Sequence, residues 1–230
     1  ITFPFDLRMP FQKMAWIIYE AIKVRIEVKY EEVLDALGRA IEIQRSVERE
    51  LSKRGEEIIN SLKDNEQGIV IVGRPYNSID SDVNLSIPHK IAAMGFKVIP
   101  IDMIPLRLEY LKGRFENIYW EYGSRIIAAL HTVADNKRLN AVYISNFKCG
   151  PDSFLLSFAE EIMGGKPLLI LEMDEHGADA GYQTRIEAFA EVLRAEREYV
   201  VTKKTISSSS DTLRKRVILI PPMHEITSRL

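Results

Sequence analysis

The sequence predicts an α/β protein: a helical arm followed by a Rossmann-like parallel sheet of about four to five strands with helices on both faces. Beyond Asn65, short β-branched runs alternate with helical stretches, which is the pattern of βαβ units. Each run also stops at a cluster of polar residues. The carboxyl ends of parallel strands share one edge of a sheet, where such folds bind ligands, so these clusters are expected to converge there.

The segment before the first strand, residues 1–66, is predicted to form the helical arm. Apolar residues recur at helical spacing from Phe11 to about Val28 and again from about Tyr30 to Leu62. The second stretch carries many charged residues between its apolar positions, which indicates a solvated face with i,i+4 pairs rather than a functional site.

Residues 67–200 are predicted to form the α/β domain, with right-handed crossovers between its strands. Gly95 and the Gly164–Gly165 pair stand where helix C-caps are expected. The predicted strands are 68–72, 96–101, 141–144 and 167–171, and the predicted helices span about 85–94, 117–136, 152–163 and 179–197.

Residues 201–230 are predicted to hold a linker and the first strand of a following, truncated unit. Ser207–Ser210 is polar, and Arg216–Ile220 is rich in β-branched and apolar residues. A strand without a following helix, and a first residue that is not methionine, lead us to expect a piece of a larger protein.

Composition limits the function classes. The 230 residues carry 31 basic and 33 acidic side chains, so no general attraction to nucleic acid or to an anionic membrane is expected. The single cysteine excludes an internal disulfide and favours a reducing compartment. No apolar run approaches the roughly 20 residues of a membrane-spanning helix, so a cytoplasmic location is expected.

The first polar cluster is Gly73–Asn77. It lacks the Gly-Lys-Ser/Thr of a Walker loop and the later glycines of a dinucleotide-binding motif. Arg74, with Tyr76 and Asn77 beside it, is a candidate clamp for a phosphate or carboxylate. The alternative is that Arg74 forms a structural ion pair with Glu172 or Asp174.

The second cluster surrounds Cys149. Asn146 ends a predicted strand, and a helix is predicted to begin near Pro151 or Asp152. A thiol beside a helix N-terminus is favoured in its thiolate form, which attacks electrophiles or binds metal. The alternative is a buried, inert cysteine that behaves as a small apolar residue.

The third cluster is acidic and holds one imidazole: Glu172, Asp174 and His176. These side chains could bind a divalent cation, or Asp174 and His176 could act as an acid–base pair. A hydrolase that uses Cys149 with His176 and Asp174 is disfavoured, since no nucleophile-elbow motif is present. Asp179 is also a good N-cap for the last helix.

Three stretches in this order, Gly73–Asn77, Ser145–Phe154 and Leu171–Phe189, make the chain resemble the CoA-substrate-specific enzyme activases, also called acyl-CoA dehydratase activase-related proteins. Those proteins are similar to the 2-hydroxyacyl-CoA dehydratase superfamily. The resemblance covers about residues 1–200.

The resemblance implies Rossmann-like lobes that hold an iron–sulfur cluster between cysteines from separate segments, and an ATP-dependent activase that passes an electron to it. Only Cys149 stands at a plausible ligand position in this sequence. The other cysteine ligands would lie upstream of Ile1, in a missing N-terminal part. A C-terminal part of the same protein is also expected to be missing, and the activase's own phosphate-binding motifs are absent. The isolated fragment is expected to hold no cluster and to be inactive.

The resemblance therefore implies that Cys149 supplies one ligand, and the chain one wall, of a cluster used in low-potential electron transfer to an acyl-CoA-type substrate. The alternative is a non-catalytic α/β module that binds a phosphate-bearing ligand at its strand-edge loops. That ligand would contact Arg74 and the other polar residues of the three clusters, which are Tyr76, Asn77, Asn146, Glu172, Asp174 and His176.

Overall fold

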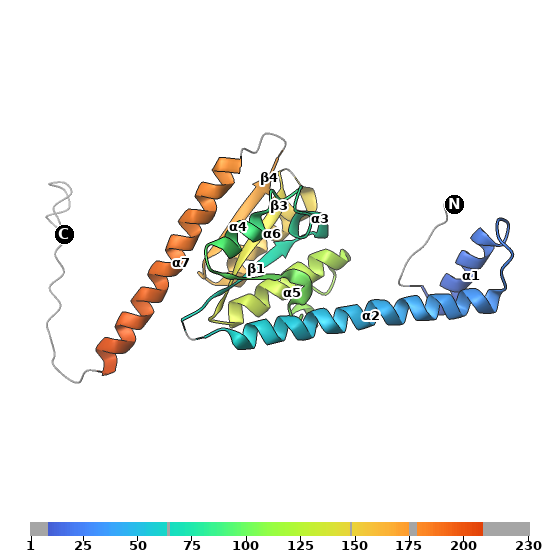
Figure 1. Cartoon of the computed structure of the whole chain (residues 1–230), viewed down its shortest axis with the longest axis horizontal. Coiled ribbons are helices and arrows are strands. Elements are labelled where there is room, and N and C mark those ends of the chain that lie inside the picture. The colour runs from blue at the N-terminus through green and yellow to red at the C-terminus, as the bar shows by residue number, and fades with distance from the viewer. Residues whose placement is uncertain (1–8, 64, 148, 175–178, 209–230) are drawn as a thin grey trace. The chain divides into compact units, whose positions relative to one another are not determined.

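The computed structural model describes residues 9–63, 65–147, 149–174 and 179–208 (Figure 1). The chain divides into two compact units, Ile1–Glu191 and Val192–Leu230. The first unit contains the arm, the sheet and the candidate site. The described part of the second unit is the remainder of the last helix.

The elements alternate between strand and helix after the arm, as the sequence predicts. In chain order they are α1 (Phe11–Ile22), α2 (Tyr30–Ser61), β1 (Gly68–Gly73), α3 (Pro75–Ser78), α4 (Ile87–Ala93), β2 (Lys97–Pro100), the 3₁₀ turns η1 (Ile101–Met103) and η2 (Leu108–Leu111), α5 (Glu121–Asp135), β3 (Leu139–Asn146), α6 (Gly150–Met163), β4 (Leu168–Met173) and α7 (Asp179–Ser208).

The described strands form one parallel sheet in the order β2-β1-β3-β4, which confirms the predicted fold class (Figure 1). All six residues of β1 are buried. A strand buried on both faces reads as a continuous apolar run, and Gly68–Gly73 has that composition because helices cover the sheet on both sides.

Side chains alternate across the sheet, so each strand contributes to two cores. On one face Val70, Val72, Ala141 and Tyr143 join a cluster of buried residues from α5 and α6. The residues between them along β1 and β3 point to the opposite face, where α4 lies against β2. The first part of α7 is fixed to β4 by the Tyr182 hydroxyl, which donates to the Glu172 carbonyl at 3.1 Å.

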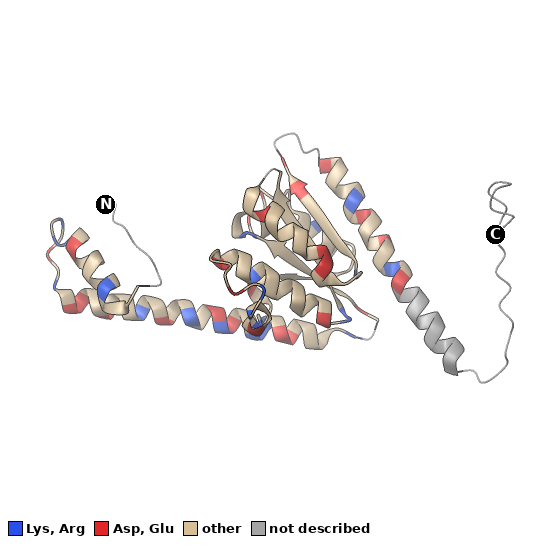
Figure 2. Cartoon of the chain, turned by 180° about the vertical axis from the view of Figure 1, so that it is seen from behind, with Lys and Arg blue, Asp and Glu red and all other residues tan. Residues whose placement is uncertain are grey.

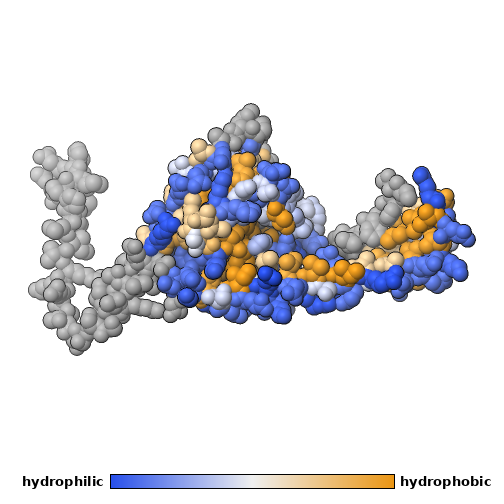
Figure 3. Space-filling model, in the orientation of Figure 1, coloured by the Kyte–Doolittle hydropathy of each residue, from blue (hydrophilic) through white to orange (hydrophobic). Residues whose placement is uncertain are grey.

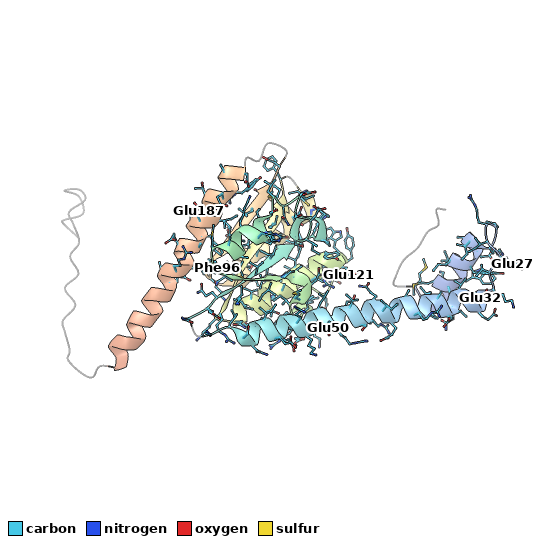
Figure 4. The ribbon with its side chains drawn as sticks, viewed as in Figure 1. Glu27, Glu32, Glu50, Phe96, Glu121 and Glu187 are labelled. Carbon is cyan, nitrogen blue, oxygen red and sulfur yellow. The ribbon has the colours of Figure 1, made fainter. Side chains whose placement is uncertain are left out.

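The arm consists of α1 packed on the first part of α2, and α2 contacts the α/β domain through η1 and β2. Trp16, Tyr19 and Tyr30 join the two helices, with ring centroids 5.6–5.8 Å apart. Glu32, in the first turn of α2, caps the helix by accepting a hydrogen bond from the backbone N–H of Lys29 at 2.7 Å. Figure 4 shows Glu32 at that end of the helix.

The surface of α2 is charged, as expected from its sequence. The ribbon in Figure 2 shows acidic and basic residues interspersed along the helix, and Arg49 donates to Glu42 at 2.7 Å. Figure 3 also shows apolar surface on the arm. The exposed large apolar residues there are Trp16, Val24, Ile26, Ile43 and Val47.

A glycine makes the contact between α2 and η1 possible. A Cβ built on Gly55 would lie 1.7 Å from the carbonyl oxygen of Met103. The helix therefore rests directly on the backbone of the turn that follows β2, and no larger residue fits without moving one of the two.

Some boundaries differ from the predictions. Helix α1 ends at Ile22, not near Val28, and α7 continues to Ser208, through the first residues of the predicted linker. No glycine or proline interrupts the sequence between residues 182 and 208, so nothing in it ends the helix earlier. The predicted strand Arg216–Ile220 lies outside the described residues. Gly95 and Gly164 do follow helices, with φ of 91° and 59°, as predicted.

None of the described helices is both long enough and apolar enough to span a lipid bilayer.

The close contact at Gly55 generates a stability prediction. Gly55→Ala should lower the free energy of unfolding by about 1–3 kcal/mol, because the added methyl group meets a backbone carbonyl that cannot turn away. Urea unfolding followed by circular dichroism measures this change.

Gly38→Ala, in the same helix, is the matched control. A Cβ at Gly38 meets only the ring of Phe11 at 3.8 Å, an ordinary contact, so this substitution should stabilise by up to about 1 kcal/mol. Similar effects of the two substitutions would contradict the proposed contact.

Candidate functional site

The carboxyl edge of the sheet has a switch point between β1 and β3. The chain leaves β1 toward β2 on one side and later returns to place β3 on the other side. Ligands of open parallel sheets bind outside the carboxyl ends of the strands at such a point. Arg74 follows β1 and Cys149 follows β3, so the first two polar clusters border this switch point.

Gly73 brings the two strands together at this edge. A Cβ on Gly73 would lie 2.5 Å from the carbonyl oxygen of Ile144, its register partner on β3, and the φ of Gly73 is +156°. Only glycine tolerates both the conformation and the close approach. The residue that begins the Gly-Arg-Pro-Tyr-Asn motif therefore has a structural role.

Arg74 is held by a carboxylate from α6. Its Nε donates to Oδ1 of Asp152 at 3.0 Å, and Ser145 Oγ donates to the other carboxylate oxygen at 2.8 Å. Asp152 is fully buried, whereas 26% of the Arg74 side chain is exposed. The sequence predicted a structural ion pair of Arg74 as one alternative. The pair exists, but the prediction that Glu172 or Asp174 would be the partner was wrong. Asp152 is the partner because α6 begins directly over the end of β3.

The electrostatic setting keeps Arg74 charged. Partial burial opposes its charge, but Asp152 and the Tyr76 hydroxyl outweigh this, so the pKa of Arg74 is raised. The Nη1 of Arg74 donates to that hydroxyl at 3.2 Å, and Tyr76 itself is exposed. Burial, with the nearby Asp152 carboxylate, also raises the pKa of Tyr143, so Tyr143 remains a neutral phenol beneath the edge.

Cys149 is the N-cap residue of α6 and is partly exposed. Its backbone N–H donates to the Asn146 carbonyl at 3.0 Å, and its own carbonyl accepts from the Ser153 hydroxyl at 2.8 Å. These bonds fix the backbone at the start of the helix. Cys149 is partly exposed, whereas the alternative of an inert cysteine requires full burial.

Several buried polar groups in β3 and in the connection that follows β1 lack hydrogen-bond partners among the described residues. Asn77, in α3, and Asn84, just before α4, are each fully buried, and neither the oxygen nor the nitrogen of either carboxamide has a partner. The Asn146 side-chain oxygen and the Tyr143 hydroxyl are also unpartnered. Most buried polar groups in proteins are hydrogen-bonded, so these groups are exceptions to the usual pattern.

The third cluster is only partly described. Glu172 is exposed on β4, in register with Ser145, and Asp174 is exposed directly after the strand. His176 lies outside the described residues, so the acid–base pair and the hydrolase arrangement stay predictions. The described part of the chain contains no group of three or more His, Cys, Asp or Glu side chains arranged to hold a metal ion.

A pocket of about 480 Å³ lies away from this edge, where α2 and the end of α5 meet the start of β3. Its lining is mixed in charge: Glu56, Ile59, Asn60, Pro105, Arg107, Tyr110, Thr132, Asp135, Asn136, Lys137 and Leu139. None of the predicted site residues lines it.

Asp152, Asn84 and Tyr143 are not among the site residues predicted from the sequence. The sequence did contain a signal for Asp152, because this residue lies in the first turn of a helix that follows a strand with a polar end. Asn84 and Tyr143 had none, because an unpartnered amide or phenol can be recognised only when burial is known.

Comparison with known proteins gives one family. Residues 3–104 match the family model described as "CoA enzyme activase uncharacterised domain (DUF2229)". No curated protein and no solved structure matches the chain. The matched region includes Arg74 and Asn77 but ends before Cys149. It supports the resemblance to activase-related proteins, while the 2-hydroxyacyl-CoA dehydratase part of that resemblance stays a prediction.

The Arg74–Asp152 pair generates an asymmetric prediction. Arg74→Gln leaves a fully buried carboxylate with Ser145 alone and should cost about 3–5 kcal/mol. Asp152→Asn leaves a partly exposed guanidinium that water can reach, and should cost only about 1–2 kcal/mol. Urea unfolding of the two variants measures the difference. A larger loss for Asp152→Asn would show that the pair does not depend on burial of the carboxylate.

Proposed function

We propose that this chain takes part in the activation of acyl-CoA dehydratase-type enzymes, and that Cys149 supplies one thiolate ligand to an iron–sulfur cluster. The observation that carries this proposal is the position of Cys149: a partly exposed thiol at the N-terminus of α6, beside the switch point of a Rossmann-like sheet. The match of residues 3–104 supports the activase-related role.

The local chemistry of Cys149 suits ligation by a thiolate. Cys149 is the N-cap residue of α6, so the backbone N–H groups of the first turn lie beside it. Arg74 is held by Asp152 of the same turn and adds a positive charge there. The backbone of Cys149 is held by Asn146 and Ser153, so the sulfur has a defined position.

This chain does not fit a whole cluster by itself. A cubane cluster normally takes four cysteine ligands, and the chain has one cysteine. The remaining ligands would come from another part of a longer protein or from a partner protein. The family suggests a dehydratase as that partner. An ATP-dependent activase would then be the electron donor. A reduced thiol also requires a reducing compartment, in line with the expected cytoplasmic location.

Iron analysis tests this proposal. When the chain is purified without oxygen from its host, together with any protein that stays bound, we expect iron and acid-labile sulfide in the complex. Cys149→Ser should lose both, while Ser157→Ala, which changes an exposed serine further along α6 and keeps the thiol, should retain them. Equal iron content in wild type and Cys149→Ser would refute a role of Cys149 as a ligand.

A second candidate function is the binding of a phosphate-bearing ligand at the same edge. The observation that favours it is Arg74: its Nε is fixed by Asp152 and its Nη1 by Tyr76, which leaves Nη2 without a partner among the described residues. A guanidinium that is already positioned loses little freedom when it binds a phosphate oxygen. The first turn of α6 lies next to it.

Titration with pyrophosphate tests this second candidate. Arg74→Lys keeps the positive charge but loses the planar fork, so the dissociation constant should rise about tenfold or more. Arg114→Lys, which changes an exposed arginine paired with Glu161, is the control and should leave binding unchanged. Equal weakening by both substitutions would indicate general charge attraction rather than a site at Arg74.

A further inference from the structure

The pocket at the ends of α2 and α5 lies between elements that are fixed to one another. Arg138 donates to the carbonyl of Leu62 at 2.6 Å, which joins the end of α2 to the start of β3. The close contact of Gly55 with the Met103 carbonyl holds the same end of α2 against η1. The cavity between these elements measures about 480 Å³, a size that is usual for small-molecule sites.

The wall formed by η2 and α5 is also fixed. The Tyr110 hydroxyl donates to the Asp135 carboxylate, and the Tyr110 ring stacks on His131 with ring centroids 4.8 Å apart. The bond to Asp135 raises the pKa of Tyr110, so the hydroxyl keeps its proton. Two lining residues from different elements therefore have defined positions.

The lining combines apolar surface with charged side chains. Ile59 and Leu139 are buried and supply the apolar part. Four exposed charged residues also line the pocket: Glu56, Arg107, Asp135 and Lys137. Among the described residues none of these four has an ion-pair partner. A ligand can therefore meet two acidic and two basic side chains without breaking an existing ion pair.

The backbone adds negative charge on one side of the pocket. Helices α2 and α5 both end there, and neither has a basic residue in its last turn. The C-terminal end of a helix carries partial negative charge, which favours a cation. Lys166 offsets this charge at α5, because its ammonium donates to the Val133 and Asn136 carbonyls at 2.6 Å and 2.5 Å. The position best suited to a cationic ligand group is thus at Glu56, beside the end of α2.

From these observations we propose that the pocket binds a small zwitterion, a molecule with an ammonium group and a carboxylate on an apolar body, as in a free amino acid or a short peptide. Glu56 accepts N–H bonds from the ammonium, and Arg107 and Lys137 donate to the carboxylate. The apolar body lies against Ile59 and Leu139. This site is separate from the carboxyl edge of the sheet and depends on neither candidate function proposed for that edge.

A ligand with a single charge suits this lining less well. An anion is repelled by the carboxylates of Glu56 and Asp135, and a cation is repelled by Arg107 and Lys137. A zwitterion pairs with both kinds of side chain. A site built to bond a polar ligand group discriminates against an analogue that lacks that group, so loss of either charge from the ligand should weaken binding.

Calorimetry on the whole chain with valine, the dipeptide divaline and two analogues of valine tests the proposal. Valinamide keeps the ammonium but has no carboxylate, and isovalerate keeps the carboxylate but has no ammonium. Valine or divaline should give saturable binding, and each analogue should bind at least about tenfold more weakly. Tighter binding of divaline would assign the pocket to peptides, and tighter binding of valine would assign it to free amino acids.

Two substitutions connect the binding to the lining. Glu56→Gln should reduce the preference for valine over isovalerate about tenfold, because the ammonium loses its anionic partner. Arg107→Gln should reduce the preference for valine over valinamide, because the carboxylate loses a donor. Glu57→Gln and Arg39→Gln are the matched controls on α2. Neither of these residues lines the pocket, so both variants should bind valine as wild type does.

Two results would overturn the proposal. One is the absence of saturable binding of both valine and divaline at concentrations up to about 10 mM. The other is binding of valinamide or isovalerate as tightly as valine, which would mean that one charge is sufficient. Glu56 and Arg107 are exposed, so both variants should fold, and circular dichroism checks this. A bound ligand also raises the unfolding midpoint, and Glu56→Gln should diminish this rise.

Discussion

The pairing of β1 with β3 is the constraint on which the rest of the molecule depends. Each strand is almost wholly buried, so the two can stay together only if helices cover both sheet faces. At their carboxyl ends Gly73 lets the backbones approach, and this brings Arg74 within reach of α6. The fold and the candidate site therefore share one structural cause.

That arrangement places a buried carboxylate at the functional edge. Asp152 is shielded from water, yet it has a partner on each oxygen, Arg74 and Ser145, so its burial is offset. The Tyr143 hydroxyl and the carboxamides of Asn77 and Asn84, in contrast, have no partners among the described residues. The hydrogen-bonded groups at this edge thus fix Arg74. The unpartnered polar groups oppose folding, so stability does not explain their presence.

Much of this organisation could be predicted from sequence, because it depends on short-range patterns. The apolar run at residues 68–72 and the glycines after α4 and α6 are local signals, and the structure agrees with them. The partner of Arg74 could not be deduced, since that choice depends on where α6 begins relative to β1. The end of α7 was missed because a polar, serine-containing stretch can continue a helix when no proline or glycine stops it.

The order of the strands also decides where the chain can be divided. The region matched by the family model, residues 3–104, contains β1 and β2 but not β3. Expressed alone, that piece would expose the backbone groups along one side of β1 and the apolar side chains that face α5, which is the surface that drives edge-to-edge aggregation. The length of chain that the family model matches is therefore shorter than the length of chain that completes this sheet.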